Sequence, residues 1–385
     1  MQFVDLASQQ KRIKENIDTR IANVLSHGKY ILGPENKEVE ERLAAYVGSK
    51  YALACSSGTD ALVLALMAYG IGPGDAILTT PFTFIATAEA ASLLGATPIF
   101  VDIDLKTFNI DPVKLEETIA AFKGKNNSVA LPVNHASLTL KGVIPVDLFG
   151  LCADYDAIRE ITEREKLFLL EDAAQSMGGE YKGRKACSLG DIGCTSFFPA
   201  KPLGCYGDGG MCFTDDKAKA DLMFSASIHG TGKSQYDNVI IGMNGRFDTI
   251  QAAVLLAKFD IFEDEVELRQ KVAQKYTELL AGIKGLNTPY IPEGYKSAWA
   301  QYSILADNNE QRTKIRAALQ EKGIPSAVYY PKPLNMQTAF ESLGYKLGDF
   351  PVSEDCSDRI FSLPMHPYLT EAEQGLIVDI ISRNS

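Results

Sequence analysis

Short apolar runs alternate with longer amphipathic segments over the first two thirds of the chain. Between the runs, apolar residues recur at helical spacing and predict helices over 4–24, 35–47, 61–69, 86–94, 112–122 and 155–165. The runs themselves carry no polar alternation, which predicts buried strands at 51–55, 76–80, 98–101, 143–148, 167–171, 192–198 and 211–213. Continuous apolar strands that alternate with helices are typical of an α/β domain, whose mostly parallel sheet is covered by helices on both faces.

The pattern changes after residue 251. One or two long helices with a charged, solvated face are predicted over 252–278. They are followed by strands at 299–305 and 326–330 and by helices at 310–322 and 370–381. We therefore predict a large α/β domain over 1–253 and a smaller C-terminal α+β domain over 254–385. The irregular segment 124–141 is compatible with an extra hairpin over 129–140.

Composition narrows the function classes. An apolar content of 46% with 23% charged residues is ordinary for a soluble globular protein. The longest apolar stretch, 61–71, is shorter than the roughly 20 residues that span a bilayer, and no signal peptide is recognisable. The seven cysteines form no Cys-x-x-Cys pair, so we expect reduced thiols, no metal site and a cytoplasmic location. The net charge of −11 argues against nucleic acid and anionic membranes as partners.

A single lysine stands at the end of one predicted strand. Lys201 lies between Pro199 and Pro202, and a glycine cluster follows at 204–210. Such a segment cannot be helical and has little backbone freedom. If Lys201 is buried, desolvation lowers its pKa and makes the neutral, nucleophilic amine available for Schiff-base chemistry. Taken alone, however, a lysine of this kind is more often a solvated turn residue.

Small residues follow another strand end. The segment 56–60 leads directly into an apolar helix, so free backbone N–H groups and the positive end of the helix dipole lie at this turn. A phosphate fits such a site. An ordinary N-cap by Ser57 or Thr59 explains the segment equally well. It is not a Walker motif, because no Gly-Lys-Ser/Thr follows.

A carboxylate follows a third predicted strand, in addition to Lys201 and the turn at 56–60. Asp172 ends the predicted strand next to the one that leads to Lys201, and in isolation it is best explained as a helix N-cap. A buried carboxylate needs a positive partner, and in pyridoxal phosphate enzymes an aspartate keeps the pyridine nitrogen protonated. With the phosphate turn at Gly58 and Thr59, and with Phe84 available to stack on a ring, four requirements of this cofactor are met together.

Over nearly its whole length the chain resembles the DegT/DnrJ/EryC1/StrS family of sugar aminotransferases. The resemblance is carried by the motifs SGTDAL at 57–62, EDAAQS at 171–176, SFFPAKPLG at 196–204 and NGRFDTIQ at 244–251. It implies a fold type I aminotransferase that uses pyridoxal 5'-phosphate to aminate a nucleotide-linked keto-sugar, with glutamate as the usual amino donor.

The family's roles can be carried over to matching positions. Lys201 would bind the cofactor covalently and move protons, and Asp172 would pair with the pyridine nitrogen. Gln175 would lie near the ring hydroxyl, and Phe84 would stack on the ring. The phosphate would be held by Gly58, Thr59, Ser196 and, from the neighbouring subunit, Asn244, which implies a homodimer with shared active sites.

Within the family, segments 30–35 and 201–210 resemble enzymes that act at C3 of UDP-2-acetamido-2-deoxy-3-keto-glucuronate for surface polysaccharide such as lipopolysaccharide O-antigen. Arg246 is the candidate for the sugar carboxylate, because a guanidinium can hold a carboxylate through two hydrogen bonds. It could instead pair with Asp248 or Asp208 at the subunit interface. The other candidate sugar-pocket residues are Tyr30, Tyr329, Tyr330 and Lys332.

Three alternatives stay open. The substrate could be a neutral 6-deoxy keto-sugar nucleotide, aminated at C3 or C4. A related branch deoxygenates C3 with the same cofactor, but it has a histidine in place of Lys201. A non-enzymatic regulatory protein on this fold would have no need for Lys201, Asp172 and the phosphate turn together.

Overall fold

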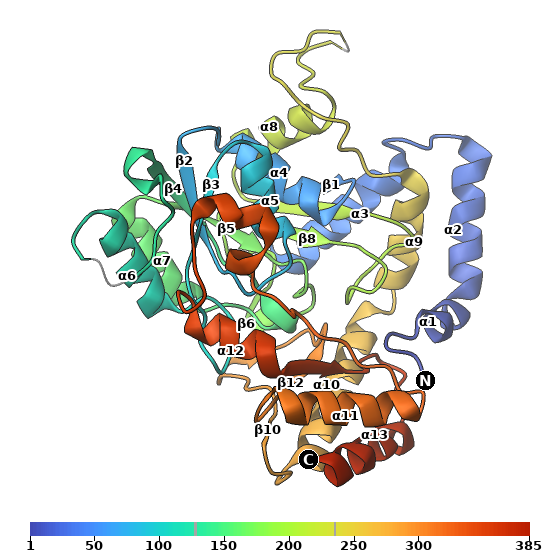
Figure 1. The fold of residues 1–385 in the computed structure, drawn as a ribbon. Coiled ribbons are helices and arrows are strands. Elements are labelled where there is room, and N and C mark those ends of the chain that lie inside the picture. The colour runs from blue at the N-terminus through green and yellow to red at the C-terminus, as the bar shows by residue number, and fades with distance from the viewer. Residues whose placement is uncertain (127–128, 235) are drawn as a thin grey trace.

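A seven-stranded sheet lies at the centre of the computed structural model, which describes residues 1–126, 129–234 and 236–385 (Figure 1). The strand order is β1-β9-β8-β5-β4-β2-β3. β9 runs antiparallel to β1 and β8, and the other neighbouring pairs are parallel, which confirms the predicted sheet. The strands are β1 (Tyr51–Cys55), β2 (Asp75–Thr79), β3 (Thr97–Phe100), β4 (Thr139–Ile144), β5 (Phe168–Asp172), β8 (Ile192–Ser196) and β9 (Gly210–Thr214).

Helices cover both faces of this sheet, because successive strand residues contribute to apolar cores on opposite sides. In β9, Cys212 packs into the core beneath α4, α5 and α8, whereas Met211 and Phe213 pack into the core beneath α3 and α9. Helices α6 and α7 cover this second face farther along the sheet. These helices are α3 (Pro34–Val47), α4 (Gly58–Ala68), α5 (Ala86–Leu93), α6 (Pro112–Phe122), α7 (Tyr155–Glu165), α8 (Lys217–Ser227) and α9 (Thr249–Phe259).

The C-terminal part is built around a small antiparallel sheet of order β10-β12-β13, drawn in orange and red in Figure 1. Its helices and strands share a second core that includes Tyr276, Tyr302 and Phe361, as expected for an α+β unit. The division at 253/254 stays a prediction, and α9 crosses that position unbroken. The elements are α10 (Phe262–Leu280), β10 (Leu286–Asn287), β12 (Tyr302–Ala306), α11 (Asn309–Glu321), α12 (Pro351–Arg359), β13 (Ile360–Leu363) and α13 (Glu371–Asn384).

Short elements connect these parts. A third sheet pairs β11 of the C-terminal part with β6 of the large part. The sequence pattern did not predict this sheet, because its strands have two residues each. Its strands are β6 (Glu180–Tyr181), β7 (Arg184–Lys185) and β11 (Tyr295–Lys296), and the 3-10 turns are His135–Ser137, Leu148–Gly150, Leu334–Met336 and Thr338–Leu343.

Two N-terminal helices, α1 (Leu6–Arg12) and α2 (Lys14–His27), replace the single helix predicted over 4–24. The helix breaks at Ile13, whose φ is −112° and ψ is 15°. Ile13 is buried in a cluster with Ile17 of α2 and Val254 of α9. The break thus allows Ile13 to pack inward where the chain changes direction.

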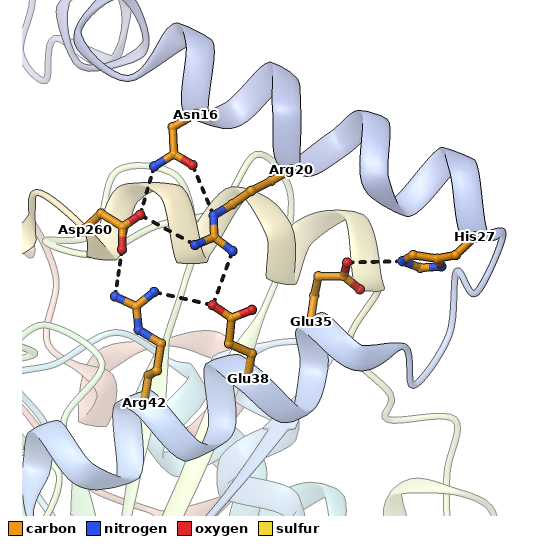
Figure 2. A network of polar contacts seen from close by, with 7 residues as sticks. All are labelled: Asn16, Arg20, His27, Glu35, Glu38, Arg42 and Asp260. Carbon is orange, nitrogen blue, oxygen red and sulfur yellow. Dashed lines mark hydrogen bonds and ion pairs between the residues drawn. The ribbon is translucent and has the colours of Figure 1, made fainter.

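A polar network fastens α2 to α3 and α9 (Figure 2). The carboxylate of Asp260 follows the last turn of α9, where it accepts a 2.8 Å hydrogen bond from Asn16 and a 2.7 Å bond from Arg42. Arg20 of α2 lies 3.6 Å from the same carboxylate and donates to Glu38 of α3 at 3.3 Å. Each charge in this network therefore faces a charge of the opposite sign, and the network holds α2 over α9.

Three local predictions were wrong. The segment 129–140, whose sequence is compatible with an extra hairpin, forms a 3-10 turn and the start of β4 instead. β4 ends at Ile144 rather than 148, and beyond it the chain makes a single bridge to β5, between Val146 and Asp172. The predicted strand 326–330 makes one bridge, between Ala327 and Ser362, and then turns away.

Within the described ranges, no helix is both long enough and apolar enough to cross a bilayer.

Candidate active site

A cavity of about 470 Å³ opens at the carboxyl ends of the central strands. Because β1, β2, β5 and β8 run in the same direction, the segments that follow them meet at one edge of the sheet. The structure thus brings residues 57–59, 83–84 and 196–201 together with Asp172. The predicted site residues that line the cavity are Gly58, Thr59, Phe84, Asp172, Gln175, Ser196, Lys201, Tyr329 and Tyr330.

Lys201 sits in a tight turn at the end of β8. Its backbone N–H donates to the carbonyl of Phe198 at 2.9 Å, and Pro199 and Pro202 flank the turn. The side chain is half-buried and faces the cavity. Burial lowers the pKa of the Lys201 amine, although the negative charge of Asp172 acts in the opposite direction. The neutral amine is therefore more available than that of a surface lysine.

Asp172 is the last residue of β5, directly beside β8 in the sheet. Its carboxylate accepts a 2.7 Å hydrogen bond from the hydroxyl of Thr87 and a 3.2 Å bond from the backbone N–H of Ala174. Burial raises the pKa of Asp172, while these two bonds and the charge of Lys201 act in the opposite direction. A cation placed beside this buried carboxylate would compensate its desolvation.

The first turn of α4 forms the predicted phosphate turn. Ser57 caps the helix by accepting a 3.0 Å hydrogen bond from the N–H of Asp60, so the N-cap explanation is also correct. Gly58 lies so close to the end of β8 that an added Cβ would come within 2.6 Å of the Ser196 Cβ. The close approach leaves the N–H groups at the start of α4 next to the Ser196 hydroxyl, where an anion is favoured.

Aromatic and amide side chains form another part of the cavity wall. Gln175 accepts a 2.8 Å hydrogen bond from the N–H of Phe149 and donates a 3.2 Å bond to the hydroxyl of Tyr330. The Phe84 ring is 57% exposed, and its centroid lies 6.4 Å from that of Tyr330. Phe84 therefore has a free face on which a planar ligand could stack.

Four predicted residues do not line this cavity in the described chain. Asn244 and Arg246 lie together, and the Arg246 Nε donates to the Asn244 Oδ1 at 2.9 Å. Arg246 makes no ion pair with Asp248 or Asp208 in the part of the chain that the structure describes, so this pairing is not found within one subunit. Tyr30 is 49% exposed and Lys332 is exposed.

Sequence reasoning did not assign site roles to several lining residues, among them Thr87, Asp208 and Gln301. Thr87 lies one helical turn beyond Phe84, and that spacing could have indicated that its hydroxyl faces the same side. Asp208 lies inside the glycine cluster that follows Lys201, a segment already assigned to the site. Gln301 comes from the C-terminal part, and no sequence signal places it at this cavity.

These residues fit pyridoxal phosphate. The Gly58 turn lacks room for a side chain and offers N–H donors to a phosphate. One cavity extends from this turn to Asp172, and the Phe84 ring and the Lys201 amine also line it. A ring nitrogen, a phosphate and an aldehyde on one planar molecule would each find a complementary group here.

The chain was compared with known families and proteins. The profile of the DegT/DnrJ/EryC1/StrS aminotransferase family matches residues 11–382. The chain is 46% identical to the UDP-2-acetamido-2-deoxy-3-oxo-D-glucuronate aminotransferase of Pseudomonas aeruginosa, over 98% of both chains.

Solved structures agree with this match. A DegT DnrJ EryC1 StrS aminotransferase from Brucella abortus superposes with a TM-score of 0.93 and 49% identity, covering 99% of this chain and 98% of that one. NtdA from Bacillus subtilis, solved with bound cofactor PMP, gives a TM-score of 0.84 and 29% identity, with coverage of 99% and 83%. PMP is the amino form of pyridoxal phosphate.

Proposed function

This chain belongs to the DegT/DnrJ/EryC1/StrS aminotransferase family, and we propose that it aminates C3 of a UDP-linked 2-acetamido-3-keto-uronic acid. It is a pyridoxal phosphate-dependent sugar aminotransferase with the fold type I architecture. The observation that carries the substrate proposal is the 46% identity, over nearly the whole chain, to an enzyme named for a UDP-3-oxo-glucuronate derivative. Neutral 6-deoxy keto-sugars and a regulatory role are disfavoured by the same likeness.

The residues of the cavity have distinct tasks in this proposal. When bound, pyridoxal phosphate supplies an electron sink that stabilises a carbanion on the carbon losing or gaining a proton. The Lys201 Nζ holds the cofactor and then carries that proton, for which its lowered pKa suits it. Asp172 keeps a proton on the ring nitrogen, and Gln175 contacts the ring hydroxyl. Gly58, Thr59 and Ser196 bind the phosphate, and Phe84 excludes water from one ring face.

The proposal also covers the donor of the amino group and the number of subunits in the enzyme. Glutamate is the expected donor. Asn244 and Arg246 do not line the cavity of their own chain. We therefore expect a homodimer, in which these two residues of one subunit reach the cavity of the other. The carboxylate of the sugar would then bind Arg246 across the interface, with Tyr30, Tyr329, Tyr330 and Lys332 around the sugar nucleotide. The product would serve surface polysaccharide such as lipopolysaccharide O-antigen, made from sugar nucleotides in the cytoplasm.

The substrate proposal can be tested with purified protein, glutamate and matched pairs of uronic and neutral UDP- and dTDP-keto-sugars. We expect amino-sugar product from the UDP-uronic substrate in preference to its neutral counterpart. Arg246→Ala should lose about 1.5–3 kcal/mol of transition-state stabilisation on the uronic sugar, the range for a hydrogen bond to a charged group, and much less on the neutral sugar. A wild type that prefers neutral sugars would refute the substrate, and equal losses on both would leave Arg246 a structural role.

A further inference from the structure

A second lysine is buried outside the cavity. Lys258 lies in the last turn of α9 and is 1% exposed. Within the described residues, its Nζ has no hydrogen-bond partner. The Tyr206 ring beside it packs into an apolar cluster with Ile17 of α2 and Ala257 of α9. Such an arrangement is unfavourable, because a buried ammonium without hydrogen bonds loses its hydration uncompensated.

The Lys258 Nζ lies 4.4 Å from the centroid of the Tyr206 ring, a distance at which a cation and an aromatic face attract each other. The same helix also holds the backbone of Tyr206. Gln251, two turns earlier in α9, accepts a 2.8 Å hydrogen bond from the Tyr206 N–H and donates a 3.2 Å bond to the Tyr206 carbonyl. One face of α9 therefore binds both the main chain and the ring of Tyr206.

Tyr206 belongs to the turn that carries Lys201. The N–H of Cys205 donates to Phe197 at 2.8 Å, and the N–H of Phe197 donates to Gly209 at 2.8 Å, so the turn is closed at its base. It is also tightly packed, since a Cβ on Gly204 would come within 2.5 Å of the Phe198 carbonyl oxygen. A displacement of Tyr206 would therefore shift the whole turn, including Lys201, rather than be absorbed locally.

We propose that Lys258 is a positioning residue for the reaction: its ammonium holds the Tyr206 ring against α9 and thereby fixes the turn that presents Lys201 to the cavity. The proposal rests on the proposed role of Lys201. A cation–π contact suits this purpose because the surroundings are dry, which strengthens the attraction. The network of Figure 2 keeps α2 in place over this site, with Asp260 only two residues from Lys258.

The contact depends on the protonation of Lys258. Burial lowers the pKa of Lys258 to about 8, while the Glu265 carboxylate of α10 favours the charged form. The Cys205 thiol stays neutral in this range, because burial raises its pKa to about 11. Glu265 is itself engaged by Gln9 of α1, at 2.7 Å, and by Tyr368. α2 contributes Ile17 and Ile21 to the apolar cluster around Tyr206, while its Asn16 and Arg20 face the carboxylate of Asp260. As the pH rises through about 8, the ring loses its cation, whereas the two hydrogen bonds between Gln251 and the Tyr206 backbone remain.

The test uses the holoenzyme and three variants. Lys258→Met keeps the length of the side chain without its charge, and Tyr206→Leu removes the ring. Lys217→Met is the matched control, because Lys217 lies 6.0 Å from the Tyr51 ring in an exposed cation–π pair far from the turn. For each we would measure kcat and KM of the holoenzyme against pH and, after the cofactor has been removed, the rate constant for covalent attachment of added pyridoxal phosphate to Lys201.

We expect Lys258→Met and Tyr206→Leu to lower kcat and the attachment rate constant roughly tenfold near pH 7, in line with a desolvated cation–π contact, and to leave KM for the sugar unchanged. Both should lack the ionisation near pH 8 that the wild type and Lys217→Met show. Wild-type values and an unchanged pH profile in Lys258→Met would overturn the proposal, and Tyr206→Leu decides if Lys258→Met does not fold. Lys201→Ala, run alongside, separates the two proposals: covalent attachment in that variant would refute the role of Lys201 itself.

Discussion

Lys201 and Lys258 are both amines whose pKa is lowered by burial, yet their surroundings differ. Lys201 faces a cavity of about 470 Å³ whose wall includes the carboxylate of Asp172. Lys258 is 1% exposed, its Nζ lies 4.4 Å from the Tyr206 ring, and it is not among the residues that line this cavity. Desolvation alone therefore does not identify the reactive amine. Access for a planar ligand and a carboxylate on the neighbouring strand distinguish the cofactor lysine from the positioning one.

The two sites also differ in how the fold supports them. Lys201 follows a central strand, so its position is set by the sheet and by the two prolines of its turn. Lys258 is set by a helix whose end is bound to α2 and α3. Substitutions at the first site should change the chemistry while folding persists. Substitutions at the second should change stability and geometry together.

The largest effect is expected for Lys201→Ala. Loss of the amine removes both covalent attachment of the cofactor and the proton carrier, so amino transfer should fall by roughly 10³-fold or more. The folded structure should persist, because the Lys201 side chain makes no hydrogen bond or ion pair in the described chain. Single-turnover assays and circular dichroism check these outcomes. Retention of wild-type turnover would contradict the assignment.

The second largest effect on the rate of amino transfer is expected for Asp172→Asn. Replacing the carboxylate by an amide removes the negative charge that keeps the ring nitrogen protonated, so the chemical step should slow by roughly 10²–10³-fold, as for loss of one preorganised electrostatic contact. Because the charge of Asp172 raises the pKa of Lys201, that pKa should fall in the variant. Cofactor binding measured by absorbance should persist, and a near-normal single-turnover rate would refute the role.

Much of this site could be predicted from the sequence because it follows strand ends. The strands β1, β5 and β8 were predicted close to their actual bounds, and parallel strands place their carboxyl ends at one edge. That reasoning brought Asp172 and Lys201 together. It did not foresee Gln301, whose approach depends on how the C-terminal part packs, nor the role of Lys258, which has no motif and lies in a helix with ordinary periodicity.

Lys258→Met should lower kcat but raise the free energy of unfolding. The folded protein holds the Lys258 proton with a pKa of about 8, against an ordinary value of 10.5 in the unfolded chain. The charged amine therefore destabilises the fold below pH 8 by about 3 kcal/mol, and this cost disappears as the pH rises from 8 to 10.5. Chemical denaturation should show a more stable variant at pH 7 and a difference that shrinks through that window. Lys217→Met should change stability by less than about 0.5 kcal/mol.

A smaller effect is expected at the phosphate turn. Gly58→Ala places a Cβ 2.6 Å from the Ser196 Cβ, so the start of α4 must move away from β8 at a cost of about 1–3 kcal/mol. Affinity for pyridoxal phosphate should fall as well. Gly375→Ala, inside α13 with no atom within 4 Å of its Cβ, should stabilise the protein by up to about 1 kcal/mol. Equal effects at both glycines would show that the close approach at Gly58 is unimportant.

The most direct test of the account compares Lys201 and Lys258 in one sample. The protein is loaded with pyridoxal phosphate, reduced with borohydride to trap the cofactor on its lysine, digested, and mapped by mass spectrometry. The account predicts the cofactor mass on Lys201 and none on Lys258, because only Lys201 opens into the cavity beside Asp172. Cofactor on Lys258, or on any lysine in place of Lys201, would contradict it.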